Sequence, residues 1–183
     1  MNLATMNMEL KTERLLLRQW KEGDFEVFAA MNADPDVMEF YPDIQGSEAS
    51  FSMAQTFQNL ISQKGWGFWA VERLSDNRFI GFVGLHEPTY DLPATPCVEI
   101  GWRLSKESWG KGYATEAAEA ALNFAFNDLK LEQVYSFTSV ANFRSRSVME
   151  KIGMKNTNEN FVHPMVPDGH RLSEHVLYKI SKV

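Results

Sequence analysis

The sequence predicts an α/β (α+β) fold, a single domain built on one mixed, twisted sheet. The 183-residue chain is long enough for one domain with a core of its own. Its composition, 44% hydrophobic and 13% aromatic, is typical of a globular protein with large apolar areas to bury. Near its middle a strand, a glycine-containing loop and a helix follow one another, which is typical of a crossover between parallel strands.

The first half of the chain predicts a strand, two helices and a hairpin. Residues 14–20 read as a strand, and a helix opens at Gly23. A second helix begins at Ser47, which can cap it, and ends at Gly65. The residues expected along one side of this helix are Phe51, Ala54, Gln55, Gln58 and Ile61. Two strands, 66–74 and 78–87, then flank a hairpin turn at residues 75–77.

The second half alternates strands and helices. The elements expected there are a strand, a helix, a strand, a helix and a strand, over residues 98–104, 113–129, 134–140, 142–152 and 172–180. Asn142 is expected to cap the second of these helices, and Gly153 to end it. Because a helix joins them, the strands 98–104 and 134–140 should be parallel.

Charge and cysteine content exclude several classes of protein. The net charge of −6 lacks the basic surface that nucleic acid or an anionic membrane requires. No apolar run approaches the roughly 18 residues of a membrane span, and residues 1–10 lack a secretory signal, so we expect a cytoplasmic protein. The one cysteine, Cys97, can form neither an internal disulfide nor a zinc cluster, and we expect buried packing from it, with no metal site.

The charges are unevenly distributed along the chain. Residues 1–60 carry ten acidic side chains against four basic ones, whereas residues 101–155 carry eight basic against six acidic, as counted from the sequence. One half could therefore face a cationic ligand and the other an anionic one, although both could equally be ordinary solvated surface.

The loop from Trp109 to Thr115 is suited to a phosphate group. Its glycines allow a close approach of backbone N–H groups, and the helix that follows adds a partial positive charge. It is not a Walker loop, since Ser105 and Gly112 stand where that pattern needs Gly and Ser or Thr. It is not a dinucleotide fingerprint either, because Thr115 replaces the third glycine. Alone, it could be a simple helix-entry turn.

Three ordered motifs together resemble a family. They are the run Glu99 to Leu104, the loop 109–117, and Asn-x-x-Ser-x-x-Val-Met-Glu-Lys-Ile-Gly-Met over 142–154. They resemble the GNAT superfamily of acetyl-coenzyme-A-dependent N-acetyltransferases, and within it the ribosomal-protein alanine and serine N-acetyltransferase branch. Segments 13–18, 79–85 and 175–178 also fit that branch in order, so the likeness covers nearly the whole chain and implies one domain over residues 9–181.

The resemblance implies where acetyl-coenzyme A lies. Such enzymes have a sheet of about six to seven strands with flanking helices, in which the fourth strand splays from the fifth and the pantetheine arm fills the gap. That gap would lie along Ile100, Trp102 and Leu104. The pyrophosphate would sit on the backbone N–H groups at the helix start. The cofactor-contacting residues implied around it are Trp109, Gly110, Lys111, Gly112, Tyr113, Ala114, Thr115, Asn142, Arg144 and Ser145.

The resemblance also implies a direct transfer to an amine, with one departure. Many members have a tyrosine that protonates the leaving thiolate where this chain has Met149, which cannot donate a proton. Ser145 is the expected substitute, although it could be a polar residue of the first helical turn. Glu99 is the expected base, directly or through a water, unless it pairs with Arg103. His86 is the reserve base.

The expected activity is acetyl transfer to a primary amine. The matching branch, which works on N-termini, and the acidic residues 1–60 favour an α-amine of a protein or peptide, although an acidic wall suits a polyamine equally well. The alternatives are a small amine such as a polyamine, amino acid or antibiotic, or a non-catalytic module that binds acetyl-coenzyme A, which Met149 leaves open. A nucleotide-dependent kinase is disfavoured by the missing Walker loop. The aromatic residues that could wall an acceptor pocket are Phe40, Tyr41, Trp66, Trp69 and Tyr90.

Overall fold

A computed structural model describes residues 9–183; part of the segment inspected for a secretory signal, residues 1–8, lies outside the described residues. The helices are α1 (Glu22–Asn32), α2 (Ser47–Lys64), α3 (Tyr113–Asn127) and α4 (Phe143–Lys151), with a short 3-10 turn η2 (Lys106–Ser108). The strands are β1 (Leu10–Lys11), β2 (Leu15–Arg18), β3 (Phe68–Arg73), β4 (Arg78–His86), β5 (Glu99–Leu104), β6 (Gln133–Ser139), β7 (Lys155–Asn156), β8 (Phe161–Val162) and β9 (Glu174–Ser181).

These strands form one mixed sheet in the order β1-β2-β3-β4-β5-β6-β9-β7, with β8 paired to β9. The mixed α/β fold is confirmed, and so is the parallel pairing of β5 and β6. The sheet has nine strands in the described chain, more than the about six to seven expected. The additional strands β1, β7 and β8 have two residues each, which is too short for an alternating pattern to appear in the sequence.

Strands β5 and β6 separate almost as soon as they meet, as the resemblance implied. Their register contains the single pair Glu99 and Tyr135, whereas β4 and β5 pair along their length from Gly81–Leu104 to His86–Glu99. Two hydrogen bonds close the narrow end: the Tyr135 N–H donates to the Val98 carbonyl at 3.0 Å, and Ser136 Oγ donates to the Ile100 carbonyl at 2.8 Å. Beyond these bonds the two strands diverge toward their carboxyl ends.

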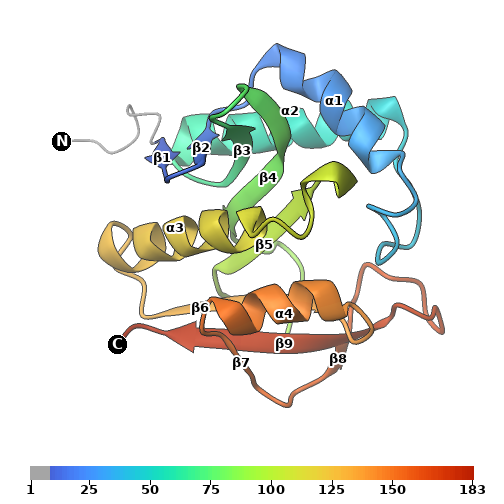
Figure 1. Cartoon of the computed structure of the whole chain (residues 1–183). Coiled ribbons are helices and arrows are strands. Elements are labelled where there is room, and N and C mark those ends of the chain that lie inside the picture. Colours follow the sequence, from blue (N-terminus) through green and yellow to red (C-terminus); the bar gives the residue numbers. More distant parts are fainter. Residues whose placement is uncertain (1–8) are drawn as a thin grey trace.

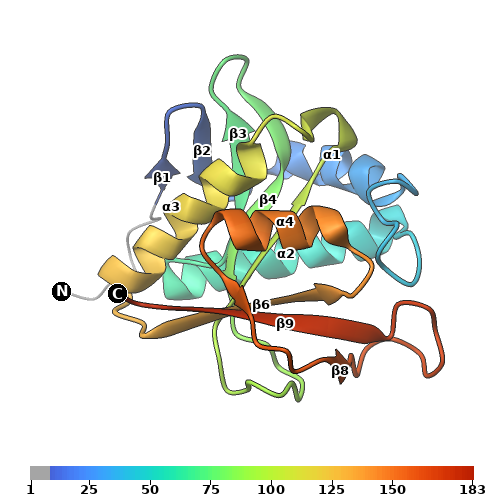
Figure 2. The same ribbon diagram turned by 60° about the horizontal axis from the view of Figure 1, so that its bottom comes forward.

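Helices cover both faces of the sheet (Figures 1 and 2). Helices α3 and α4 lie side by side on one face, in front of the sheet in Figure 2, with α3 packed mainly on β4 and β5. Helices α1 and α2 pack against each other behind it, over β3 and β4. The gap between β5 and β6 therefore opens between α3 and α4 on one side and the α1–α2 layer on the other.

Small side chains let α3 lie close to the sheet. Its buried face consists of Ala117, Ala118, Ala121, Leu122, Phe124 and Ala125. On the opposite face the contacts are aromatic, with Trp20 against Phe28 at 5.1 Å and Phe57 against Phe82 at 5.1 Å between ring centroids. The two faces together hold the sheet, and with it the splayed strands, in a fixed position.

Helix α2 differs in detail from the expectation. Its buried residues are Ser50, Ala54, Phe57 and Ile61, while Phe51 is 39% exposed and packs beside Phe25. The expected face, which runs through residues 51, 55 and 58, is rotated by about one position from the buried face, because hydrophobicity alone places Phe51 in the core. Gly65 ends the helix in the left-handed conformation as predicted. Within residues 9–183 no helix is long and apolar enough to cross a membrane.

Candidate active site

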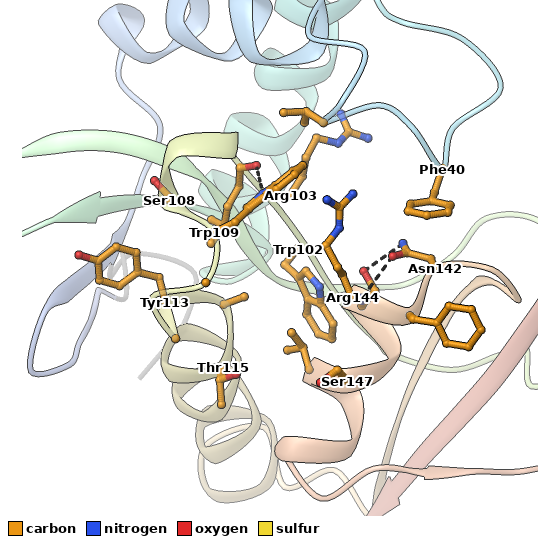
Figure 3. A pocket seen from close by; sticks show the side chains of 18 of the residues that line it. Phe40, Trp102, Arg103, Ser108, Trp109, Tyr113, Thr115, Asn142, Arg144 and Ser147 are labelled. Carbon is orange, nitrogen blue, oxygen red and sulfur yellow. Dashed lines mark hydrogen bonds between the residues drawn. The ribbon is translucent and has the colours of Figure 1, made fainter.

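A cleft of about 580 Å³ occupies the gap between the diverging strands (Figure 3). Its walls come from β5, from the loop after η2, from the start of α3, from α4 and from the segment Val37–Tyr41. The residues predicted to contact the cofactor that line it are Trp102, Leu104, Trp109, Gly110, Gly112, Tyr113, Ala114, Thr115, Asn142, Arg144 and Ser145. Chain segments more than 100 residues apart are thus brought together around one space.

Two predicted cofactor residues lie outside the lining of this cleft. Ile100 is 1% exposed and belongs to the core, although its backbone remains part of β5. The Lys111 side chain turns back along its own loop, with Nζ donating to the Glu107 carbonyl at 2.6 Å. Lys111 can therefore offer only its backbone to the cleft, because its ammonium group is engaged elsewhere.

The glycine loop has the geometry of an anion cradle. Gly110 and Gly112 have φ of +70° and +80°, a region that other residues rarely adopt, and a Cβ built at Gly110 meets no atom within 4 Å. Gly112 caps α3, whose first intrahelical bond runs from the Glu116 N–H to the Gly112 carbonyl. The preceding N–H groups of the first turn are free for a ligand, so these residues fit the pyrophosphate of acetyl-coenzyme A.

Arg144 reaches from α4 across the cleft to the loop after η2 and to the segment Val37–Tyr41. Its guanidinium lies 3.9 Å from the ring centroid of Trp109 and 5.8 Å from that of Phe40, and Nη2 donates to Glu39 at 2.9 Å. The Trp109 indole N–H in turn donates to the Leu104 carbonyl at 3.0 Å, which ties the loop to the end of β5. Trp109 therefore contributes a flat wall of the cleft and a cation–π contact with Arg144.

Asn142 and Ser145 form a small hydrogen-bonded unit at the start of α4 (Figure 3). Asn142 Oδ1 accepts from the Ser145 N–H at 3.2 Å, which confirms the predicted N-cap. Asn142 Nδ2 donates to Ser145 Oγ at 3.1 Å and to Thr138 Oγ1 at 2.9 Å. Because Ser145 Oγ accepts this bond, its own hydrogen remains available for donation.

Met149 plays no part in the cleft wall. Its side chain is 1% exposed and belongs to the hydrophobic core under α4. The hydroxyl that α4 brings to the cleft near its N-terminus is that of Ser145, and Ser147, two residues further on, also lines the cleft. The expected proton donor thus lies at the cleft, whereas the residue at the usual tyrosine position faces inward.

Glu99 lies at the narrow end of the splay, on the strand face opposite Trp102. It is 9% exposed, and burial raises the pKa of its carboxyl to about 8. It makes no ion pair with Arg103, which stands about 13 Å further along the extended strand. The alternative of a Glu99–Arg103 pair is therefore wrong, and Glu99 is not among the residues that line the cleft.

His86 stands directly across from Glu99 in the β4–β5 register. Its ring stacks on Phe68 with centroids 5.3 Å apart, and burial, with help from the Lys64 charge, lowers its pKa. A neutral imidazole beside Glu99 is consistent with the reserve function proposed for it.

The predicted aromatic wall is only partly present. Phe40 and Tyr41 line the cleft, whereas Trp69 is fully buried in the core, and Trp66 and Tyr90 lie away from the cleft. The structure adds a cluster that the sequence pattern did not indicate. It contains Tyr90, Phe137, Phe161, His163 and His175, with the two imidazoles 4.7 Å apart.

This aromatic and histidine cluster is uncharged near neutral pH. Burial, together with the nearby His175, lowers the pKa of His163 to about 4. Burial and the neighbouring Glu99 raise the pKa of the Tyr90 phenol above its ordinary range. The cluster is assembled by β6, β9 and the loops before β5 and β9, and no local sequence motif joins these elements.

Cys97 is half-buried, and burial with the nearby Glu99 raises its thiol pKa to about 11. A thiol in this environment stays protonated near neutral pH, so it has little nucleophilic character. It lines a second hollow of about 500 Å³ and is thus more exposed than the buried packing expected. Within residues 9–183 no three His, Cys, Asp or Glu side chains gather in the manner of metal ligands.

The family assignment follows from comparison with known proteins. Residues 14–155 match the family model described as an acetyltransferase (GNAT) domain, and this chain belongs to that family. The relatives include the uncharacterized N-acetyltransferase YnaD of Bacillus subtilis, 28% identical over 94% of this chain and 96% of that protein. The protein is an acetyl-coenzyme-A-dependent N-acetyltransferase, and the function expected from its motifs is confirmed at this level.

Solved structures agree with this assignment. An acetyltransferase of the GNAT family from Bacillus anthracis superposes with a TM-score of 0.78 at 28% identity, covering 95% of this chain and 98% of that one. Two more distant structures share the fold. They are a ribosomal-protein-S5-alanine acetyltransferase from Vibrio fischeri (TM-score 0.74, 16% identity, 95% and 96% covered) and a spermidine N-acetyltransferase from Vibrio cholerae (0.72, 22%, 93% and 96%), the latter in complex with CoA and spermine.

Proposed function

We propose that this acetyltransferase acetylates the α-amine of a protein or peptide N-terminus, with Glu99 as the base. The observation that carries the proposal is the position of Glu99, buried and, within the described chain, without an ion pair at the narrow end of the splay, where burial raises the pKa of its carboxyl to about 8. An α-amine has an unperturbed pKa of about 7.7–8.0, so the transfer of a proton from its ammonium form to this carboxylate is nearly balanced. A lysine side chain, with a pKa of about 10.4, would be a much poorer donor to the same base.

The cofactor is held along the cleft. The backbone N–H groups of the glycine loop and of the first turn of α3, from Gly110 through Thr115, bind the pyrophosphate, and the backbone of β5 at Ile100, Trp102 and Leu104 binds the pantetheine arm. Trp109 and Arg144 close over it from the two sides, since their side chains already meet at 3.9 Å. When bound, acetyl-coenzyme A supplies a thioester carbon that is open to attack by an amine.

Glu99 takes one proton from the ammonium, directly or through a water, and the neutral nitrogen then attacks the acyl carbon. The C–N bond forms, the C–S bond breaks, the nitrogen gives up its second proton and the departing thiolate takes up one. Ser145 is the proposed relay between the two: its Oγ donates a proton to the sulfur and regains one from the nitrogen, directly or through a water. The bond from Asn142 Nδ2 holds this hydroxyl and leaves its hydrogen available. Asn142 is thereby a positioning residue in this scheme, with its amide hydrogens engaged by Ser145 and Thr138.

A polyamine acceptor is the second candidate, favoured by the spermidine N-acetyltransferase that shares the fold. Such a polycation needs several free carboxylates. Two acids of the segment beside the cleft are already paired, Asp36 with Lys106 at 2.5 Å and Glu39 with Arg144 at 2.9 Å. This pairing reduces the support that the acidic N-terminal third gave to a cationic acceptor, so the proposal rests on Glu99.

The test is a comparison of acceptors at neutral pH, read as release of free coenzyme A thiol. The acceptors are short peptides that begin with Ala or Ser, the same peptides with a blocked N-terminus and a free lysine, and spermidine. A higher kcat/KM for the free N-termini supports the proposal. Undiminished activity on the blocked peptides, or a preference for spermidine, overturns it, and no turnover with any amine indicates a binding module.

A further inference from the structure

Arg103 is a buried cation without an acidic partner. Its side chain comes from β5 and lines the cleft beside Tyr41, yet the residue is only 7% exposed (Figure 3). Among residues 9–183 no carboxylate oxygen lies within 4.0 Å of it, whereas the other buried arginine, Arg18, pairs with both Asp24 and Glu72. A buried charge normally has a partner, because leaving water is costly for an ion.

The hydrogen bonds of Arg103 occupy only one side of its guanidinium. Nη1 donates to Asn32 Oδ1 at 2.9 Å and lies 3.8 Å from the Met53 sulfur. Nε is fully buried without a partner, and Nη2 has no acceptor within the described chain. Nε and Nη2 are the pair of donors that hold a carboxylate in a two-point contact, as Arg73 shows by binding both oxygens of Asp76 with them, at 2.9 and 2.5 Å.

Aromatic rings hold the guanidinium in place. Tyr41 lies 4.2 Å from it, Phe82 5.4 Å and Phe28 6.0 Å, measured to the ring centroids. These contacts favour a cation and fix its orientation, but they accept no hydrogen bond from Nε or Nη2 along the plane of the group. The fixed orientation and the free donors are the features of a preformed anion subsite.

We propose that Arg103 binds a carboxylate of the acceptor, so that this enzyme selects amines that also carry a carboxylate. The proposal rests on the proposed function, since it adds a specificity contact to the same acceptor site. Arg103 and Glu99 project from the same face of β5, about 13 Å apart along the strand, so an acceptor that lies along this strand meets both. Because Nε is buried, a carboxylate can contact both Nε and Nη2 only after a small displacement of the guanidinium or of the Tyr41 side chain. Tyr41 is 38% exposed.

The carboxylate has two sources, an acidic side chain of a peptide or the carboxylate of a free amino acid. The first is tested with the amidated peptides Ser-Glu-Ala and Ser-Gln-Ala, which differ only in that charge. The second is tested with free serine and serinamide. We expect the charged member of one pair to have a kcat/KM about 10- to 100-fold higher, the range of a hydrogen-bonded charge contact, and the pair that shows it identifies the source.

The variant Arg103→Met keeps the length of the side chain and removes its donors. It should abolish the preference for the charged acceptor. Since the buried Asn32 Oδ1 loses its donor in this variant, the melting temperature is measured alongside to establish that the variant is folded. Arg78→Met, which removes a cation from the exposed end of the β3–β4 hairpin, should leave the preference unchanged. An unmodified enzyme that shows no preference in either pair, or an Arg103→Met enzyme that retains one, overturns the proposal.

Failure of the proposed function can be recognised separately. If the enzyme acetylates no amine, the binding of acetylated Ser-Glu-Ala-amide and Ser-Gln-Ala-amide is measured by calorimetry with coenzyme A present. Tighter binding of the Glu product, lost in Arg103→Met, supports the carboxylate subsite even then. Equal binding of the two products shows that Arg103 recognises no carboxylate.

Discussion

Arg14 holds the glycine loop from behind through Glu116. Arg14 Nε donates to Glu116 Oε2 at 2.7 Å, and the Arg14 N–H donates to Oε1 at 2.8 Å. The same guanidinium donates through Nη1 to the Lys111 carbonyl at 2.9 Å and lies 4.6 Å from the Tyr113 ring. Burial opposes the charge of Glu116, but hydrogen bonds from Thr12 and Arg14 outweigh it and lower the pKa of this carboxyl. Arg14, in the β1–β2 turn, thus fixes the start of α3 and holds the Lys111 carbonyl toward its own guanidinium.

Arg14→Ala should weaken the binding of acetyl-coenzyme A by about 3- to 30-fold, because the loop must then be ordered at the moment of binding. Acetyl-pantetheine, which lacks the pyrophosphate, should bind equally well to both proteins. The measurement is the KM for each thioester. Arg14→Lys keeps the charge but cannot make both contacts, so it should resemble Arg14→Ala. Full recovery in Arg14→Lys would show that charge alone matters, and an equal loss for both thioesters would contradict a local effect on the loop.

Gly112→Val should abolish cofactor binding. Gly112 has a φ of +80°, which a β-branched residue adopts only with strain, and its Cβ would stand 3.3 Å from Arg14 Nη2. At about 100 times its dissociation constant, acetyl-coenzyme A should stabilise the unmodified protein by about 2.7 kcal/mol, seen as a higher melting temperature. The variant should stay folded and lose this increase.

Gly46→Ala provides the matched control for that experiment. Gly46 caps α2 with a φ of −71°, and a Cβ there meets no atom within 4 Å. This variant should keep the full thermal shift with acetyl-coenzyme A. A shift retained in Gly112→Val would mean that the cradle does not hold the cofactor.

Local patterns predicted most of what the site needs. The crossover from β5 through α3 to β6 could be predicted because each segment has its own period and the joining loop contains glycines. The Asn142 cap is predictable for a similar reason, since the capping residue and the unpaired N–H groups of the first helical turn are neighbours in sequence. The lining of the cleft by Trp109, Gly112 and Ser145 was implied by the resemblance of the ordered motifs to a family and not by the local patterns, which for the glycine loop allow a simple helix-entry turn as well.

The contacts between distant segments could not be predicted in this way. Arg14 meets Glu116, and Arg144 meets Glu39, only because the sheet order brings their strands and helices together. The alternation along β5 places Glu99 and Arg103 on the same side and so allows an ion pair, but an extended strand keeps residues four positions apart out of contact. The histidine cluster, likewise, depends on β6 and β9 lying side by side.

Ser145→Ala should lower kcat by about 10²- to 10⁴-fold with little change in the KM for acetyl-coenzyme A, if its hydroxyl protonates the leaving thiolate. Ser145→Thr keeps a hydroxyl on the same carbon and should restore part of the rate. Ser52→Ala, on the exposed side of α2, serves as the control and should change nothing. A loss below about threefold would assign Ser145 to the helix turn alone and leave protonation to solvent.

The pKa of Glu99 predicts how activity depends on pH. With its carboxyl at about 8, the fraction of ionised base increases up to that pH, so kcat/KM should rise with pH and level off near 8. Glu99→Gln should lower kcat/KM by about 10²- to 10⁴-fold and abolish this rise. A rise that persists unchanged in Glu99→Gln would assign the titration to the amine and not to this residue.

Glu99 should also make the stability of the protein depend on pH in an unusual direction. Burial raises its native pKa to about 8 from an ordinary 4.5, so between these values the native state holds a proton that the unfolded chain has released. The contribution of Glu99 to the free energy of unfolding is therefore complete below about pH 4.5 and is lost as the pH rises to about 8. Glu99→Gln resembles the neutral acid at every pH. Its melting temperature should match that of the unmodified protein below about pH 4.5 and exceed it increasingly up to about pH 8, beyond which the difference stays constant. A difference that does not change with pH would mean that the pKa of Glu99 is not raised in the native protein, which removes the pKa match on which the preference for an α-amine rests.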